Sequence, residues 1–300
     1  TSTVSLRSSI YKHIQENGRT YHRYRHGKYP LPNDEAKQDR LDLQHAVFDV
    51  ALSGKLYLAP LGENLQHVLD IGTGTGIWAI DFAQIHPAAC VIGTDLSPIQ
   101  PLYIPPNVQF EINDAEDEWT FRQKFDFIHG RALVTCFKDP SFVIAEAYKS
   151  LAPGGYLELQ DGIFPFEYIG DPPTDSAVYK WNELVVAGAA KSGRPWTNVQ
   201  HYKRWMEETG FESVVEKTYY FPTSPWARGR YYRDIAIMWQ EDITGGLEAV
   251  SLKVMGNLGW SVDEIRVFIA AVRDDFRNTN IHCYTPVKVV YGRKPGGDSP

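Results

Sequence analysis

The glycine-rich segment HVLDIGTGTGIWAI, residues 67–80, has the residue types of a ligand-binding turn. An apolar run at 68–71 predicts a short buried strand, and the residues after 76 have helical spacing. Between them, Gly72, Gly74 and Gly76 allow positive φ and close approach of a ligand to the backbone. Strand, glycine turn and helix form the first unit of a doubly wound sheet, where ligands bind at the carboxyl ends of strands. The segment therefore predicts a site for an anionic or nucleotide-like ligand.

The spacing of the glycines separates two kinds of cofactor. A dinucleotide fingerprint counted from Gly72 requires a third glycine where the chain has Ile77. The chain instead reads D-x-G-x-G-x-G from Asp70, which resembles motif I of the Rossmann-like methyltransferases that use S-adenosylmethionine. This resemblance implies a loop around the methionine and ribose parts of the cofactor, with Thr73 and Trp78 included. A dinucleotide site and a glycine turn without a ligand are the alternatives.

An acid follows the second predicted strand, residues 90–94, at Asp95. A carboxylate there can accept hydrogen bonds from both ribose hydroxyls, and we assign its neighbour Leu96 to the same site. Alternatively, DLSP begins a helix, with Ser97 as N-cap and Pro98 at the first helical position. Both roles are compatible, because Ser97 can cap a helix while Asp95 binds the ribose.

The third predicted strand, residues 108–112, is followed by Asp114 and Ala115. The methyltransferase resemblance implies that Asp114 receives the adenine amino group and that Ala115 offers its backbone amide to the ring. A solvated acidic loop is the alternative, because residues 116–118 are acidic as well.

Two further strands complete the predicted core. FDFIHGRAL ends at His129 and Arg131, and LAPGGYLELQD ends near Gln160 and Asp161 after a glycine turn. We count Arg131 among the cofactor-binding residues. The alternation of strands and helices predicts an α/β fold with a parallel sheet. The methyltransferase resemblance implies that this is the Rossmann-like sheet of the class I methyltransferases.

Length, composition and net charge limit the classes of protein to which this chain can belong. The 300 residues are 43% hydrophobic, enough for one large domain or a domain with a lid, and the net charge of −7 argues against a nucleic-acid binder. The three cysteines are far apart, so we expect neither a disulfide framework nor a metal site. No apolar run approaches the ~20 residues of a membrane span, and the first residues lack a signal-peptide pattern. We therefore expect a cytoplasmic protein, with the nucleus as the alternative.

The predicted elements divide the chain into four parts. They are a helical cap (1–66), the cofactor-binding core (67–165), a helical lid (166–278) that includes one core strand near 211–222, and a final strand with a tail (279–300).

Helical spacing and end signals locate the helices of the cap and the lid. The cap has a helix from about Asp34, and the lid begins with two helices that end at Gly193 and Gly210. Residues 226–278 are mostly helical and lie between the last two strands. We interpret this insert as a lid or as a dimer surface.

Six segments together carry a closer resemblance. They are NGRTYHRYRHGKYPLPNDEAKQDRLDLQH, VLDIGTGTGIWAIDFA, VIGTDLSPIQP, PPNVQFEINDAEDEW, FDFIHGR and LAPGGYLELQD. Over about residues 15–165 the chain resembles the LaeA-like methyltransferases of filamentous fungi. The resemblance implies S-adenosylmethionine as the cofactor and an N-terminal block, with Tyr29, Asn33 and Asp34, that closes over it. Lys37 departs from the family pattern, because an acid often stands there.

The chemistry of methyl transfer decides which catalytic groups are needed. The methyl group is already activated, so alignment and desolvation supply much of the catalysis. A carboxylate acceptor needs no base at neutral pH, whereas a phenol, with a reference pKa of about 10, needs one. His129 is the candidate base. Its alternatives are a core histidine and a contact to the methionine part, and His22 and His201 are weaker candidates.

The predicted lid is rich in aromatic and arginine residues, most of which we expect to pack in the core. A few can line a pocket for an apolar or aromatic metabolite, and the candidates are Trp196 and Tyr231. Arg194 and Arg131 are the candidates for holding an acceptor carboxylate in a bidentate clamp.

Two functions from different classes stay open. The first is O-methylation of a carboxyl or hydroxyl group on a small secondary metabolite. The second is that of a LaeA-like regulator in a nuclear protein complex. A small acceptor pocket under the lid favours the first, and a shallow, open cofactor mouth favours the second. N- or C-methylation differs from the first only in the acceptor atom, and homodimerisation through the helical insert stays open.

Overall fold

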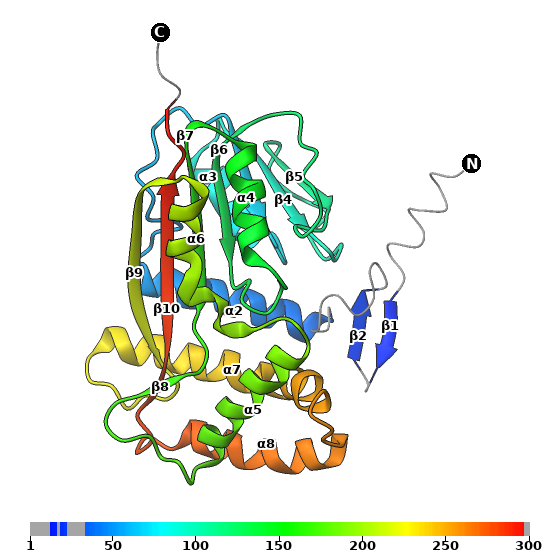
Figure 1. Ribbon diagram of the computed structural model, residues 1–300, viewed down its shortest axis with the longest axis vertical. Helices are drawn as coiled ribbons and strands as arrows, with labels where there is room; N and C mark the ends of the chain where they lie inside the picture. The colour runs from blue at the N-terminus through cyan, green and yellow to red at the C-terminus, as the bar shows by residue number, and fades with distance from the viewer. Residues whose placement is uncertain (1–12, 17–18, 23–33, 297–300) are drawn as a thin grey trace.

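The computed structural model describes residues 13–16, 19–22 and 34–296. Its main sheet contains β3 (His67–Ile71), β4 (Cys90–Asp95), β5 (Val108–Ile112), β6 (Phe125–Arg131), β7 (Leu151–Gly162), β8 (Glu167–Tyr168), β9 (Glu212–Pro222) and β10 (Cys283–Arg293). The order across the sheet is β5-β4-β3-β6-β7-β10-β8, and β9 pairs with β10. In Figure 1, β3 to β7 lie in the upper part of the molecule, and β9 and β10 extend from there down to β8.

The first five strands of this order are parallel, so their carboxyl ends meet at one edge of the sheet. β10 is antiparallel to β7, β8 and β9. The central strands are buried on both faces, as parallel sheets require, and Val68, Phe127 and Ile128 are fully buried. The α/β class with a Rossmann-like sheet that the sequence predicts is confirmed.

The helices of the described chain are α2 (Glu35–Ala51), α3 (Ile77–Ile85), α4 (Pro140–Ser150), α5 (Ala177–Lys191), α6 (Tyr202–Thr209), α7 (Arg230–Gly256) and α8 (Val262–Arg277), with the 3₁₀ helix η1 (Trp196–His201) before α6. α5, α7 and α8 contact one another, and α2 packs against α7. In Figure 1, α2 crosses below the sheet and the other three helices form a layer beneath it. No helix of the described chain is long and apolar enough to cross a membrane.

Local signals account for the helix ends that the sequence predicts. Asp34 is the N-cap of α2, and its side chain accepts a hydrogen bond from the backbone N–H of Lys37. Gly193 and Gly210 follow α5 and α6 with φ of +73° and +106°, a conformation that glycine adopts without strain. The helical insert between the last two strands is present as α7 and α8. The division of the chain into cap, core and lid stays a prediction.

The helix that the sequence places from about Asp34 is present as α2. Before it, β1 (His13–Glu16) and β2 (Arg19–His22) form an antiparallel pair, which is not among the elements predicted from the sequence.

The predicted helix at Ser97 is absent, because the segment forms a turn closed by side chains. The backbone N–H of Ser97 donates to Asp95 Oδ1 at 2.9 Å, and Gln100 Nε2 donates to the Ser97 carbonyl at 2.9 Å. Pro101 follows within a few residues, and proline in a helix interior removes a hydrogen bond and clashes with the preceding turn.

Candidate functional site

The glycine loop turns from β3 into α3 through left-handed backbone conformations. Gly72, Gly74 and Gly76 have φ of +62°, +59° and +83°. A Cβ added to Gly74 would lie 3.1 Å from Leu41 Cδ1, so α2 covers the loop closely. The close approach of backbone to α2 explains why a residue without a side chain stands at this position.

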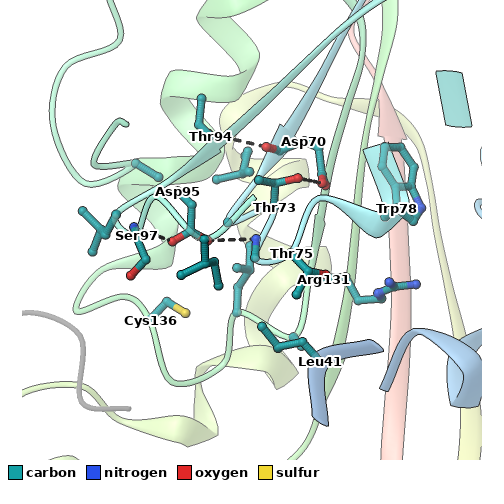
Figure 2. A pocket seen from close by; sticks show the side chains of 18 of the residues that line it. Leu41, Asp70, Thr73, Thr75, Trp78, Thr94, Asp95, Ser97, Arg131 and Cys136 are labelled. Atoms are coloured by element: carbon teal, nitrogen blue, oxygen red, sulfur yellow. Dashed lines mark hydrogen bonds between the residues drawn. The ribbon is translucent and has the colours of Figure 1, made fainter. Parts of the chain in front are cut away.

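Asp95 joins the end of β4 to this loop. Its Oδ2 accepts a hydrogen bond from the backbone N–H of Gly74 and its Oδ1 accepts one from Ser97, each at 2.9 Å, as Figure 2 shows. Burial raises the pKa of the Asp95 carboxyl, while these hydrogen bonds and the charge of Lys37 lower it. Each carboxylate oxygen has a second lone pair, so Asp95 can accept further hydrogen bonds from a ligand.

A cavity runs along the glycine loop and the strand ends, with about 1130 Å³ of space unfilled by protein atoms, including the part open to solvent. The predicted cofactor residues that line it are Asp70, Gly72, Thr73, Gly74, Trp78, Asp95, Leu96, Asp114, Ala115 and Arg131. Gly76 does not line it, because it is the N-cap of α3 and a Cβ there would meet the ring of Phe110. Tyr29 lies outside the described residues.

Asp70 and His129 form a buried pair at the floor of this cavity. Asp70 Oδ2 accepts a hydrogen bond from Thr73 Oγ1 at 2.6 Å, and Asp70 Oδ1 lies 2.8 Å from His129 Nδ1. The Trp78 ring stacks on the His129 ring with centroids 3.7 Å apart. Burial lowers the pKa of His129, although its hydrogen bond with Asp70 raises it. Held on two sides and fully buried, His129 has the geometry of the core-histidine alternative, and its role as a base stays a prediction.

Arg131 is engaged by residues of α2. Its Nη2 donates to His45 Nδ1 at 2.8 Å, and its guanidinium carbon lies 5.0 Å from the centroid of the Phe48 ring. His45 Nε2 lies 3.1 Å from Asp81 Oδ2 on α3. Burial and the charge of Arg131 lower the pKa of His45 to about 3, so its neutral ring accepts from Arg131 and donates to Asp81. This contact holds α2 against the sheet edge and uses one donor of the Arg131 guanidinium, which also lines the first cavity.

A second cavity adjoins the first beneath α7, with about 880 Å³ of unfilled space, including its open part. Its apolar wall consists of Phe48, Phe164, Phe166, Trp181, Trp239, Ile243, Leu247, Val250 and Val287. Lys37, Leu41, Gln44 and Ala132 line both cavities. The size and the apolar wall with few polar groups are typical of a site for a small organic molecule.

An ion pair between α2 and α7 supplies polar groups of the second cavity. Arg40 Nη1 donates to Asp242 Oδ1 at 2.9 Å, and Gln44 Nε2 donates to Asp242 Oδ2 at 3.3 Å. The three residues were not predicted as site residues. No local signal identifies them, because the two helices are distant in the sequence and meet only in the folded chain.

The three residues predicted to bind the substrate line neither cavity. Arg194 donates to Glu116 Oε2 from Nη2 at 3.1 Å and to the Cys136 carbonyl, so its guanidinium is not available as a clamp. Trp196 is packed in the core beneath Phe164, with ring centroids 5.0 Å apart. Tyr231 is exposed, and its hydroxyl donates to the Ala51 carbonyl at 2.9 Å. Contacts between distant segments hold these side chains away from the two cavities, and their role in substrate binding stays a prediction.

The fold and these two cavities define a Rossmann-like protein with a nucleotide-cofactor loop and an adjoining apolar site. The model of a protein family described as a methyltransferase domain matches residues 43–217 of this chain. The chain therefore belongs to the methyltransferase family. The predicted fold class is confirmed, and the prediction of an enzyme that uses S-adenosylmethionine agrees with this membership.

Curated fungal proteins are similar over nearly the whole chain. The methyltransferase pytC of Aspergillus terreus is 36% identical over 98% of this chain and 92% of that protein. The probable methyltransferase tdiE of Emericella nidulans is 31% identical over 97% and 92%. The secondary metabolism regulator laeA of Aspergillus niger is 34% identical over 100% and 81%. The predicted resemblance to LaeA-like methyltransferases is confirmed.

The fold also matches a solved structure of a more distant protein. Phosphoethanolamine N-methyltransferase 2 of Haemonchus contortus, in complex with S-adenosyl-L-methionine, has a TM-score of 0.54 at 13% identity, over 98% of this chain and 73% of that one. The likeness supports the arrangement of strands and helices.

Proposed function

We propose that this protein methylates an oxygen atom of a small organic acceptor, with S-adenosylmethionine along the glycine loop and the acceptor in the second cavity. The proposal rests on the position of the two cavities side by side: four residues line both, namely Lys37, Leu41, Gln44 and Ala132. An in-line displacement requires the acceptor atom to approach the methyl carbon directly, and adjoining cavities provide that alignment. A regulator with a shallow cofactor mouth has no need of the second cavity.

The residues of the first cavity fit the cofactor. Asp95 has lone pairs for two ribose hydroxyls, and Gly74 lets the backbone approach the ligand closely. Asp114 and Ala115 line the same cavity and would hold the adenine ring. When bound, the cofactor supplies a methyl group that is activated by attachment to a positively charged sulfur.

The chain's own contribution is alignment and exclusion of water. Leu41 on α2 covers the loop, and the aromatic wall of the second cavity strips water from the acceptor. Lys37, Arg40 and Gln44 place hydrogen-bond donors on this wall. Donors and positive charge suit an acceptor oxygen that carries negative charge, which favours O-methylation over N-methylation.

Replacing Asp95 with alanine is expected to weaken S-adenosylmethionine binding about 100-fold, because two hydrogen bonds to a charged group are lost, each worth about 1.5 kcal/mol or more. Calorimetric titration measures the affinity. Asp126→Ala is the matched control: Asp126 Oδ2 accepts hydrogen bonds from Gln66 N and His67 N at the amino end of the strands, at 2.6 and 3.0 Å. An Asp95→Ala variant with wild-type affinity would contradict the assignment, and so would binding of NAD in place of S-adenosylmethionine.

Gly74→Ala is expected to reduce the same affinity about tenfold, since an L-residue with left-handed backbone costs about 1–2 kcal/mol and the new Cβ crowds Leu41. Gly54→Ala is the control, because Gly54 has φ of +79° with nothing within 4 Å of a Cβ. Both variants carry backbone strain, but only the first lies in the site. Equal effects of the two on binding would exclude a specific role of the loop.

Methyl transfer itself is tested with labelled S-adenosylmethionine and a panel of phenols, enols and carboxylic acids. Incorporation of label into an oxygen of one class supports the proposal. Cofactor binding without transfer to any small molecule would favour the regulatory function.

A further inference from the structure

Among the titratable residues of the described chain, Lys37 alone lines both cavities. It lies in the first turn of α2, three residues after the N-cap Asp34, and is only 5% exposed. Lysine is rarely buried to this degree. A buried lysine that lines both cavities lies near the place where an acceptor atom would meet a methyl donor.

Charged and titratable groups from several elements act on this amine. They include Arg40 on α2, Cys136 after β6, Asp242 on α7 and Asp95 at the end of β4. Asp242 also binds Arg40 and Gln44, so its charge is divided among several partners. Burial and the charge of Arg40 lower the pKa of Lys37 to about 7, against the opposing effects of Cys136, Asp242 and Asp95. At neutral pH, the amine and ammonium forms are therefore both well populated.

We propose that Lys37 is a catalytic residue that takes the proton from an acidic hydroxyl group, a phenol or an enol, of the acceptor in the second cavity. This inference rests on the proposed function and names its acceptor class. The acceptor O–H bond breaks and its proton binds the lone pair of Lys37 Nζ. The oxygen forms a bond to the methyl carbon as the carbon–sulfur bond breaks, and the electron pair of that bond stays with sulfur. The ammonium then returns its proton to solvent.

The shape and chemistry of the second cavity select this acceptor class. Phe48, Phe164, Phe166, Trp181 and Trp239 give it an aromatic wall, which suits a flat ring. A carboxylate acceptor needs no base, and an aliphatic alcohol is too weak an acid for this amine. His129, the other candidate base, lines the first cavity but not the second.

The test uses 7-hydroxycoumarin, a flat phenol whose fluorescence excitation distinguishes phenol from phenolate. At pH 7, wild-type protein is expected to bind this probe mainly as phenolate. Lys37→Met, which keeps the length of the side chain and removes the amine, should lower the bound phenolate fraction about tenfold, the effect of one pKa unit. Lys180→Met, at an exposed lysine of α5, is the matched control and should behave as wild type.

A second readout separates proton transfer from simple attraction between charges. NMR of ¹⁵N-lysine-labelled protein, with the Lys37 signal assigned by its absence in Lys37→Arg, should show the amine converting to ammonium when the probe binds at pH 8. A Lys37 signal that does not change, or a wild-type protein that binds the probe as phenol or not at all, overturns the proposal. S-adenosylmethionine binding by wild-type protein is measured separately. Its absence would refute the proposed function and leave the proton-transfer result to stand alone.

Discussion

Replacing Trp181 with alanine is expected to lower the free energy of unfolding by about 3–5 kcal/mol, the usual cost of removing a buried tryptophan. The side chain is 3% exposed and lies in the core shared by α5, α7 and α8. Its ring centroid lies 5.8 Å from that of Phe166 and 5.8 Å from that of Phe276. Urea denaturation measures the change as a lower midpoint at an unchanged slope.

Trp181→Phe separates the aromatic packing from the indole hydrogen bond. Trp181 Nε1 donates to Ser251 Oγ at 2.8 Å, and Ser251 is fully buried. The phenylalanine variant keeps most of the apolar contact and leaves Ser251 without this donor, at a cost of about 1–2 kcal/mol. An alanine variant as stable as the phenylalanine variant would contradict the assigned packing. Because Trp181 also lines the second cavity, alanine should widen the range of bulky acceptors that the protein methylates.

Asp161→Asn is expected to remove a pH dependence of stability that the buried carboxyl imposes. Asp161 is fully buried at the end of β7, where Oδ1 accepts from Val134 N and Oδ2 accepts from the Tyr202 hydroxyl, each at 3.0 Å. Burial raises the pKa of Asp161 from 3.8 to about 7, against the hydrogen bonds, which lower it. An asparagine retains both contacts, because its oxygen accepts from Val134 and its amide donates to the Tyr202 oxygen.

The sign of the effect follows from proton binding. Between pH 3.8 and about 7 the folded protein keeps a proton on Asp161 that the unfolded chain releases. The contribution of Asp161 to stability is therefore fully present below pH 3.8 and is lost as pH rises through about 7. The Asn variant should gain stability relative to wild type across this window, by on the order of 4 kcal/mol at about 1.4 kcal/mol per pKa unit. A difference between the two proteins that stays constant from pH 4 to 8 would contradict this assignment. Tyr202→Phe, which removes one donor to the carboxylate, should extend the window to higher pH.

This carboxyl also bears on the site. Asp161 holds the backbone N–H of Val134, and Ala132 and Val134 line the second cavity. Ala132 has φ of +57°, a strained conformation for a residue with a side chain. Asp161 thus stabilises the segment after β6 that lines the second cavity.

Much of the cofactor site is local in the sequence. Gly72 and Gly74 follow a buried strand directly, and Asp95 and Asp114 each follow a neighbouring parallel strand. Because parallel strands end at one edge of a sheet, residue type and position in the chain together predict that these groups meet. The absence of a helix at Ser97 shows the limit of such reasoning. Gln100 Nε2 donates a hydrogen bond to the Ser97 carbonyl, and the segment forms a turn.

The residues of the proposed acceptor site come from segments that are far apart in the sequence. Lys37, Arg40 and Gln44 on α2 meet Asp242 on α7, and aromatic residues from the segment after β7, from α5 and from α7 complete the wall. Arg194 is the reverse case. Its residue type suggests a substrate-binding role, but in the folded chain its guanidinium pairs with Glu116.

The sequence by itself determined the α/β class, the glycine loop, the acids after the second and third strands and the membership in a methyltransferase family. These features depend on the period of apolar residues and on backbone conformations that only certain residues adopt, and both are properties of short segments. The tertiary structure decided that Lys37 lines both cavities, that Arg194 is engaged by Glu116, and that an aromatic cavity adjoins the cofactor site. The physical reason is that burial, side-chain pairing and cavity shape arise from contacts between segments far apart in the chain, which the spacing of residues does not encode.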